Sequence, residues 1–341
     1  MNLPNTLEST VTALLASGKG ILAADESFPT IGKRFAALKI HSTEENRRSY
    51  RELLFTAPGL NESISGVILF DETMRQKTAS GASLPELLAG HKIIPGIKVD
   101  AGTMGLPGFS GEKITNGLDG LRERLGAYRE LGARFTKWRA VISVGEQLPT
   151  AGAIAANAHA LALYAALSQE AGLVPIVEPE VLMDGRHSLA RGEEVMSLTL
   201  KTVFATLTEQ RVALETMLLK TGLVLPGKDC SQQAGVDEVA EATLRCLRRT
   251  VPAAVPGIVF LSGGQKDVAA TERLNALCRV GGAPWRLSFS FGRALQDAAL
   301  KTWQGSPANR APAQAALLHR ARCNSLALLG KYSADEENAT A

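Results

Sequence analysis

Three lysines lie at the ends of short apolar runs, where a charged side chain is costly to bury. They are Lys98, Lys137 and Lys220, and a fourth apolar run ends in the carboxylates Glu178 and Glu180. A lysine is almost never fully buried unless another group pairs with its charge. Several ammonium groups and carboxylates gathered at the ends of buried strands are typical of a catalytic site.

Lys220 is the candidate nucleophile. Attack of an amine on a carbonyl requires a neutral nitrogen, whereas a free lysine has a pKa of about 10.4. Apolar walls and the neighbouring cations Lys98 and Lys137 would lower that pKa. The alternative is a lysine whose charge simply reaches solvent at a strand end. The two further lysines at equivalent strand ends favour the nucleophile.

Three carboxylates are candidates for proton transfer. Glu178 and Glu180 flank Pro179 in the sequence, so an extended strand would point both side chains to the same side. They could share one proton for acid–base chemistry, or serve as counter-ions for Lys137 and Lys220. Asp25 ends the first apolar run, where it could cap a helix or act as a base.

Glycine-containing turns follow the last two apolar runs and could bind phosphate. Turns at these two positions form a common phosphate site in β/α barrels, and an arginine adds a charged fork for phosphate oxygens. The candidate ligands here are Ser262, Gly263, Gly264, Ser290, Gly292 and Arg293. Ser27, Thr30, Lys33 and Arg34 could hold a second phosphate on the far side of the ring. Lys98 and Arg139 lie at two further strand ends of the same ring and are also candidates for substrate binding.

Eight apolar runs alternate with longer amphipathic segments, which predicts parallel strands joined by helices. The predicted strands are 20–25, 65–70, 93–99, 134–138, 173–178, 216–220, 258–262 and 286–290. The predicted helices include 43–55, 118–131, 150–171, 192–210, 236–248 and 308–329. Eight such units favour a single closed β/α (TIM) barrel over residues 1–332, with extra helices and a short, polar, flexible tail over 333–341.

The composition excludes several classes of protein. The chain has 341 residues, is 45% hydrophobic and carries a formal net charge of +3. Basic residues are scattered and not interleaved with aromatic ones, so no nucleic-acid partner is expected. We find neither a secretory signal nor an apolar stretch approaching the ~20 residues that span a bilayer. The four dispersed cysteines are typical of a reduced, cytoplasmic protein.

Two motifs are rejected. Gly222–Asp229 nearly matches a P-loop, but Asp229 stands in place of the required Ser or Thr. The five histidines are spread singly along the chain, so no zinc site is expected. The prediction includes no metal and no cofactor.

With these residues in view, the chain resembles the class I fructose-bisphosphate aldolases from about Leu14 to Tyr332. The resemblance rests on the motifs Gly20–Ser27, Gly66–Phe70, Gly96–Asp100, Lys137–Arg139, Pro175–Glu180, Leu218–Lys220, Phe260–Gln265, Phe289–Leu295 and Asn324–Ala327. It implies reversible cleavage of fructose 1,6-bisphosphate to dihydroxyacetone phosphate and glyceraldehyde 3-phosphate, without a metal, in a homotetramer.

The resemblance also implies roles for individual residues. Lys220 matches the Schiff-base lysine, Glu178 the glutamate that transfers protons during imine formation, and Asp25 the base for carbon–carbon cleavage. Lys137 matches the lysine beside the imine, with Glu180 as its carboxylate partner. The pocket for the C1 phosphate corresponds to Ser262, Gly263, Ser290 and Arg293, and the C6 end to Ser27, Arg34 and Lys98.

The chain departs from the family pattern close to these sites. Thr221 follows the candidate nucleophile where the family usually has proline, and Phe28, Pro29 and Thr30 replace a Thr-Gly-Ser segment near the C6 phosphate. The sequence ends in Ala341 without the terminal tyrosine of animal enzymes, so another group or water would serve its proton step. Two alternatives stay open, namely cleavage of another ketose phosphate such as fructose 1-phosphate, and a non-catalytic scaffold.

Overall fold

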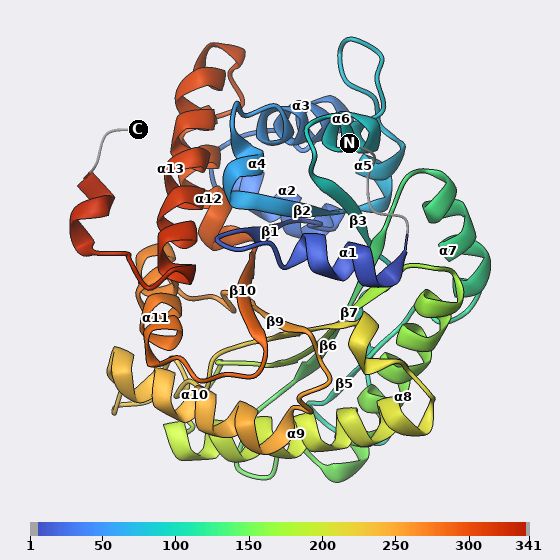
Figure 1. Cartoon of the computed structure of the whole chain (residues 1–341), viewed down its shortest axis with the longest axis vertical. Helices are drawn as coiled ribbons and strands as arrows, with labels where there is room; N and C mark the ends of the chain where they lie inside the picture. The colour runs from blue at the N-terminus through green and yellow to red at the C-terminus, as the bar shows by residue number, and fades with distance from the viewer. Residues whose placement is uncertain (1–5, 339–341) are drawn as a thin grey trace.

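The computed structural model describes residues 6–338, and its centre is a closed barrel of eight parallel strands. The strands follow one another around the barrel in the order β1-β10-β9-β8-β7-β6-β3-β2 (Figure 1). Their bounds are β1 Gly20–Ala24, β2 Ile64–Leu69, β3 Ile94–Lys98, β6 Phe135–Ile142, β7 Val174–Val181, β8 Leu218–Thr221, β9 Gly257–Phe260 and β10 Arg286–Phe291. The predicted TIM barrel is therefore confirmed, with a strand at each of the eight predicted places.

Helices surround the barrel on all sides in Figure 1. They are α1 Leu7–Leu14, α2 Phe28–Ala36, α3 Glu44–Phe55, α4 Leu60–Ser63, α5 Asp71–Arg75, α6 Leu84–Gly90, α7 Leu121–Glu130, α8 Ala151–Glu170, α9 Leu189–Glu209, α10 Val236–Thr250, α11 Asp267–Val280, α12 Arg293–Trp303 and α13 Arg310–Leu328. Short 3-10 helices occur at η1 Leu214–Thr216, η2 Pro307–Asn309 and η3 Ala334–Asn338. All six predicted helices are present, with ends that differ by a few residues.

Some elements lack a strong sequence signal. The antiparallel strands β4 (Thr103–Gly105) and β5 (Lys113–Thr115) are only three residues long, and β4 is exposed, so no apolar run marks them. Helix α12 begins at Arg293, inside the turn that follows β10, whereas the sequence pattern there predicts only a phosphate-binding turn. Strands β6 and β7 run past their predicted ends, so Arg139 and Glu180 lie within strands.

The barrel interior forms a core separate from the layer between strands and helices. It consists of alternate strand residues such as Ile68, Phe135 and Leu218, and α1 packs against it through Val11 and Leu14. This alternation follows from the two-residue period of a strand, and it places every second side chain inside the barrel. The interior is therefore filled with side chains, and the chemistry is confined to its ends.

Two glycines make room for large rings in this interior core. A Cβ atom at Gly96 would lie 2.3 Å from the ring of Phe135, and one at Gly20 would lie 2.4 Å from the ring of Phe289. Contacts this short do not occur between real atoms, so a side chain at either position would displace a ring. The aromatic rings thus fill space that the missing side chains leave.

The polar C-terminal segment differs in part from the predicted flexible tail. Residues 334–338 form η3, and Glu337 in it forms an ion pair with the buried Arg320 of α13. The hydroxyl of Tyr332 donates to the same carboxylate over 2.6 Å. Because a buried guanidinium needs a counter-ion, the segment folds back despite its polar composition. Residues 339–341 lie outside the described residues.

No apolar stretch of membrane-spanning length is expected from the sequence, but among the described residues one helix is long and apolar enough to cross a membrane by length and composition. It is α8, whose most apolar window has a mean hydropathy of 1.3 and is 56% buried. Helix α8 packs against β6, β7 and α9. Its apolar composition is therefore accounted for by its position in the core of the fold.

Candidate active site

The carboxyl ends of the barrel strands surround a cavity of about 510 Å³. Thirteen of the fifteen residues predicted for the site line it: Asp25, Arg34, Lys137, Arg139, Glu178, Glu180, Lys220, Ser262, Gly263, Gly264, Ser290, Gly292 and Arg293. They come from six of the eight strands and from the segments that follow them. The closed barrel brings together residues that are far apart in the sequence, as the ring of polar strand ends predicts.

Glu178 links two lysines at the floor of this cavity. Its carboxylate oxygens lie 3.2 Å from Nζ of Lys220 and 3.2 Å from Nζ of Lys137. The second lysine also pairs with Asp25, at 2.7 Å. Lys220 and Glu178 are each only 3% exposed, and Lys137 is 5% exposed. Two ammonium groups and two carboxylates thus form a chain with no net charge, which makes their burial possible.

The charges of Asp25 and Lys137 are mutually stabilised. Burial opposes ionisation of Asp25, but the adjacent Lys137 and Lys220 together hold the pKa of its carboxyl well below the ordinary value. Burial likewise opposes the ammonium of Lys137, yet Asp25 and Glu178 raise its pKa above the ordinary value. Both groups are therefore charged at neutral pH.

Glu180 has a different partner from the one that the resemblance implies. It accepts a hydrogen bond from Nε of Arg139, whereas Lys137 pairs with Asp25 and Glu178. In the register of β6 and β7, Lys137 lies opposite Ile176 and Arg139 opposite Glu178. Lys137 and Arg139 therefore each pair with the glutamate that lies two residues after the β7 residue directly opposite them. Because of this offset, Glu180 pairs with Arg139, and the expected pair of Glu180 with Lys137 is not formed.

The turns after β9 and β10 leave several polar groups free. Gly263 and Gly264 have φ values of +55° and +94°, a region that glycine adopts without strain. The hydroxyl of Ser290 is buried and has no hydrogen-bond partner among the described residues. Arg293 begins α12 and forms no ion pair within the part of the chain that the structure describes. A free cation, a free hydroxyl and a helix N-terminus at one place suit an anion.

On the opposite side of the cavity the cations already have carboxylate partners. Arg34 lines the cavity and pairs with Glu26 at 2.6 Å, and the same carboxylate also pairs with Arg51. An anion that binds here would share Arg34 with Glu26. This end is therefore less strongly positive than the end at Arg293.

Two predicted residues do not line the cavity. Lys98 donates to the backbone oxygen of Asp100 over 2.7 Å and pairs with its carboxylate over 2.6 Å. Ser27 precedes α2, and its hydroxyl lies 3.2 Å from that of Thr30. Both side chains are bonded close to their own place in the chain, which draws them away from the cavity.

The structure adds Lys228 and Asp184 to the cavity wall, joined by an ion pair of 2.5 Å. Lys228 lies in the segment that resembles a P-loop in sequence. Its backbone N–H donates to the carbonyl of Met183 over 2.7 Å, which ties the segments after β7 and β8 together. The Gly-Lys pair at 227–228 could have indicated that Lys228 belongs to the site. It was set aside because the segment does not complete a P-loop motif.

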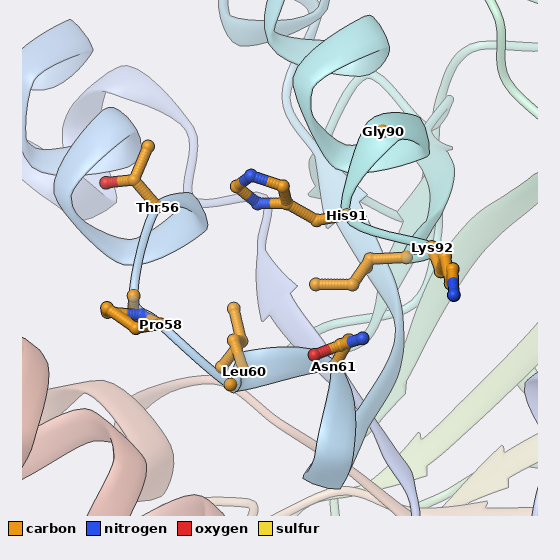
Figure 2. Close-up of a pocket in the computed structure, with 10 residues that line it drawn as sticks. Thr56, Pro58, Leu60, Asn61, Gly90, His91 and Lys92 are labelled. Atoms are coloured by element: carbon orange, nitrogen blue, oxygen red, sulfur yellow. The ribbon is translucent and has the colours of Figure 1, made fainter.

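A second cavity, of about 390 Å³, lies at the amino-terminal ends of β2 and β3. Figure 2 shows His91 pointing toward Thr56 across this opening, with Leu60 and Asn61 on another side. Nδ1 of His91 lies 3.1 Å from the carbonyl oxygen of Phe55. Lining residues with no carboxylate and few ionisable groups offer little for catalysis, so the site lies at the carboxyl ends.

Comparisons with known proteins agree on one family. A sequence profile described as Fructose-bisphosphate aldolase class-I matches residues 6–341. The chain is 57% identical over 327 residues to a probable fructose-bisphosphate aldolase class 1 of Xylella fastidiosa, covering 96% of this chain and 98% of that protein. It is 50% identical over 338 residues to the fructose-bisphosphate aldolase of Dictyostelium discoideum, covering 98% and 95%.

A solved structure is similar over nearly the whole fold. It is the fructose-bisphosphate aldolase of Plasmodium falciparum in complex with TRAP and a small-molecule inhibitor. The TM-score is 0.95 at 48% identity, and the match covers 98% of each chain.

Proposed function

Because the chain belongs to the class I fructose-bisphosphate aldolase family, we propose that Lys220 forms a Schiff base with the substrate ketone. The reaction is the reversible cleavage of fructose 1,6-bisphosphate to dihydroxyacetone phosphate and glyceraldehyde 3-phosphate. The observation that carries this proposal is the contact of Glu178 with Lys220 at the floor of the cavity.

The first step is addition of Lys220 to the C2 ketone. The attacking nitrogen must be neutral, and Glu178, 3.2 Å away, can accept the proton it gives up. The nitrogen–carbon bond forms as the carbon–oxygen π bond breaks, and a proton passes from the attacking nitrogen to the ketone oxygen, which becomes a hydroxyl. Glu178 then returns a proton to this hydroxyl, which leaves as water, so that a protonated imine remains.

Asp25 is the base for cleavage. It removes the C4 hydroxyl proton, the C3–C4 bond breaks, and the bond's electron pair moves into the protonated imine to give a neutral enamine. The positive charge of Lys220 is one of the causes that lower the pKa of Asp25. Because that charge disappears during the step, the carboxylate becomes more basic as it takes up the proton.

The two ends of the substrate have different places in this proposal. The C1 phosphate lies at the turns after β9 and β10, where Ser290 and Arg293 have no side-chain partner among the described residues and Ser262 also lines the cavity. The C6 phosphate lies toward Arg34 on the opposite side. Two anchored ends hold the open sugar across the cavity, which aligns C2 with Lys220.

Reductive trapping tests the assignment of the nucleophile. Borohydride reduction in the presence of dihydroxyacetone phosphate, followed by peptide mass mapping, is expected to place one adduct on Lys220. The variant K220A is expected to form none. K228A is a matched control, because it removes another lysine of the cavity and is expected to keep the adduct. An adduct elsewhere, or none in the wild-type protein, contradicts the mechanism.

A second substrate class has one observation in its favour. The cation at the C1 end is unpaired among the described residues, whereas Arg34 at the other end is shared with Glu26. This distribution favours retention of ketose 1-phosphates such as fructose 1-phosphate. A comparison of kcat/KM for the bisphosphate and the monophosphate separates the two, and a preference for the monophosphate would overturn the first choice.

We infer three further properties from the family. The enzyme works without a metal, assembles as a homotetramer and resides in the cytoplasm. Its relatives include a cytosolic protein of Arabidopsis thaliana and chloroplastic proteins, so the location requires its own test by fractionation. Lyase activity that persists in chelator, and light scattering of the purified protein, test the other two.

A further inference from the structure

Three side chains with metal-binding atoms meet outside the substrate cavity. His319 and Cys323 are four residues apart on α13, so they lie on the same face of that helix. Glu337 reaches them from η3. One ligand atom of each lies within 4.8 Å of the others. In Figure 1 the C-terminal segment lies at the outer edge of the molecule beside α13.

We propose that His319, Cys323 and Glu337 bind one Zn²⁺ ion. Nitrogen, thiolate sulfur and carboxylate oxygen are the donors that zinc takes in proteins, with bonds of about 2.3 Å to sulfur and 2.0–2.1 Å to nitrogen. In a tetrahedral site these bond lengths place the nitrogen and sulfur about 3.6 Å apart. Nε2 of His319 lies 3.7 Å from Sγ of Cys323, so the two helix ligands need almost no movement.

The surroundings of Glu337 fit a ligating carboxylate. The hydroxyl of Tyr332 donates to Oε1, and Nη1 of Arg320 donates to Oε2. Each carboxylate oxygen has two lone pairs, so either oxygen can keep its hydrogen bond while it binds the ion. Carboxylates that bind metals are commonly oriented by such hydrogen bonds. The thiolate and the carboxylate would supply two negative charges at the ion, and Glu337 would share its charge between Zn²⁺ and Arg320.

The ion would connect the end of the chain to the barrel. None of the three ligands lines the substrate cavity, and Cys323 is only 1% exposed. The cluster joins α13, which packs against α11 and α12, to the segment that holds η3. A metal that binds only the folded state stabilises it by mass action, so the ion would stabilise the folded end of the chain. Three side chains leave the fourth tetrahedral position to water.

Cobalt is the probe for this site. Chelator-treated protein is titrated with Co²⁺ alone, and one equivalent is expected to give a thiolate-to-cobalt charge-transfer band and the visible bands of tetrahedral cobalt, with Zn²⁺ bleaching both. C323S is expected to abolish the charge-transfer band, and H319Q and E337Q to weaken binding by more than about 100-fold. C230S is the matched control, because it removes a thiol outside the cluster and is expected to retain the bands.

Thermal unfolding provides a second readout that does not depend on spectra. Zn²⁺ is expected to raise the Tm of chelator-treated wild-type protein and C230S, but not that of C323S. The Tm of C323S without metal shows whether this variant folds. The absence of cobalt bands in the wild-type protein, or equal effects of Zn²⁺ on wild-type and C323S protein, overturns the proposal. Lyase activity in the chelator-treated protein is independent of either result.

Discussion

Glu178 lies 3.2 Å from Lys220, and no other carboxylate among the described residues forms an ion pair with that lysine. The same glutamate is shared with Lys137, which is held by Asp25 on its other side. Lys137 therefore has two carboxylates, whereas Lys220 has only a share of one. Glu178 is therefore the neighbouring base of Lys220, and it is shared with Lys137.

Replacement of this base is expected to slow catalysis without preventing substrate binding. E178Q removes the proton acceptor of Lys220 but keeps the shape of the side chain, so kcat is expected to fall about 10²–10⁴-fold. Steady-state kinetics give the effect on kcat and KM, and the rate of borohydride trapping reports imine formation alone.

E180Q is the matched control for E178Q. It changes the neighbouring carboxylate on the same strand, whose partner is Arg139. A smaller loss of kcat is expected, because this pair contacts neither Lys220 nor Lys137. Equal losses of kcat and of trapping rate in the two variants would contradict the role of Glu178.

Asp25 gives stability a defined dependence on pH. Its pKa in the folded protein is below the unfolded value of about 3.9, so its contribution is present at neutral pH and is lost as the pH falls below about 4. The pKa of Lys137 is raised, so its contribution to the free energy of unfolding has the opposite dependence on pH. That contribution is fully present below about pH 10.4 and is lost as the pH rises further.

Urea unfolding of wild-type protein and D25N across this range measures the effect. The difference between their free energies of unfolding is expected to be constant near neutral pH and to shrink as the pH falls below about 4. A difference that grows in acid would show that Asp25 is not held as a carboxylate by Lys137.

The two cationic ends of the cavity are expected to differ in which substrate they affect. R293A removes the unpaired cation of the proposed C1 site, and loss of hydrogen bonds to a charged group costs about 1.5–3 kcal/mol, or roughly 10–150-fold in kcat/KM. The loss is expected for both fructose 1,6-bisphosphate and fructose 1-phosphate, because both carry the C1 phosphate.

R34A provides the comparison. It is expected to lower kcat/KM for the bisphosphate and to leave the monophosphate nearly unchanged. If R34A lowered kcat/KM for both substrates and R293A lowered it only for the bisphosphate, the substrate would lie the other way round in the cavity.

The barrel interior predicts a contrast between two glycines. G96A places a Cβ atom 2.3 Å from the ring of Phe135, so the ring must move, and a loss of about 1–3 kcal/mol is expected. Gly126 in α7 has open space around its Cα atom, and G126A is expected to stabilise the helix by about 1 kcal/mol. Chemical denaturation measures both, and a neutral G96A would mean that the interior is loosely packed.

The sequence by itself determined the barrel and most of its site. A strand buried on both faces requires a continuous apolar run, and such runs are visible locally, as in β3 and β8. Parallel closure then places the polar residue after each run at the same end of the barrel. For this reason Lys220 and Glu178 could be assigned to one site although they lie on different strands.

Only the tertiary structure decided which side chains pair. Because of the offset between β6 and β7, Arg139 pairs with Glu180. Ser27 and Lys98 bond to groups close to them in the chain and do not line the cavity. Partner choice depends on the relative shift of two strands and on how far each side chain reaches, and neither quantity is present in residue spacing. Likewise, Glu337 meets His319 only because the chain folds back after α13.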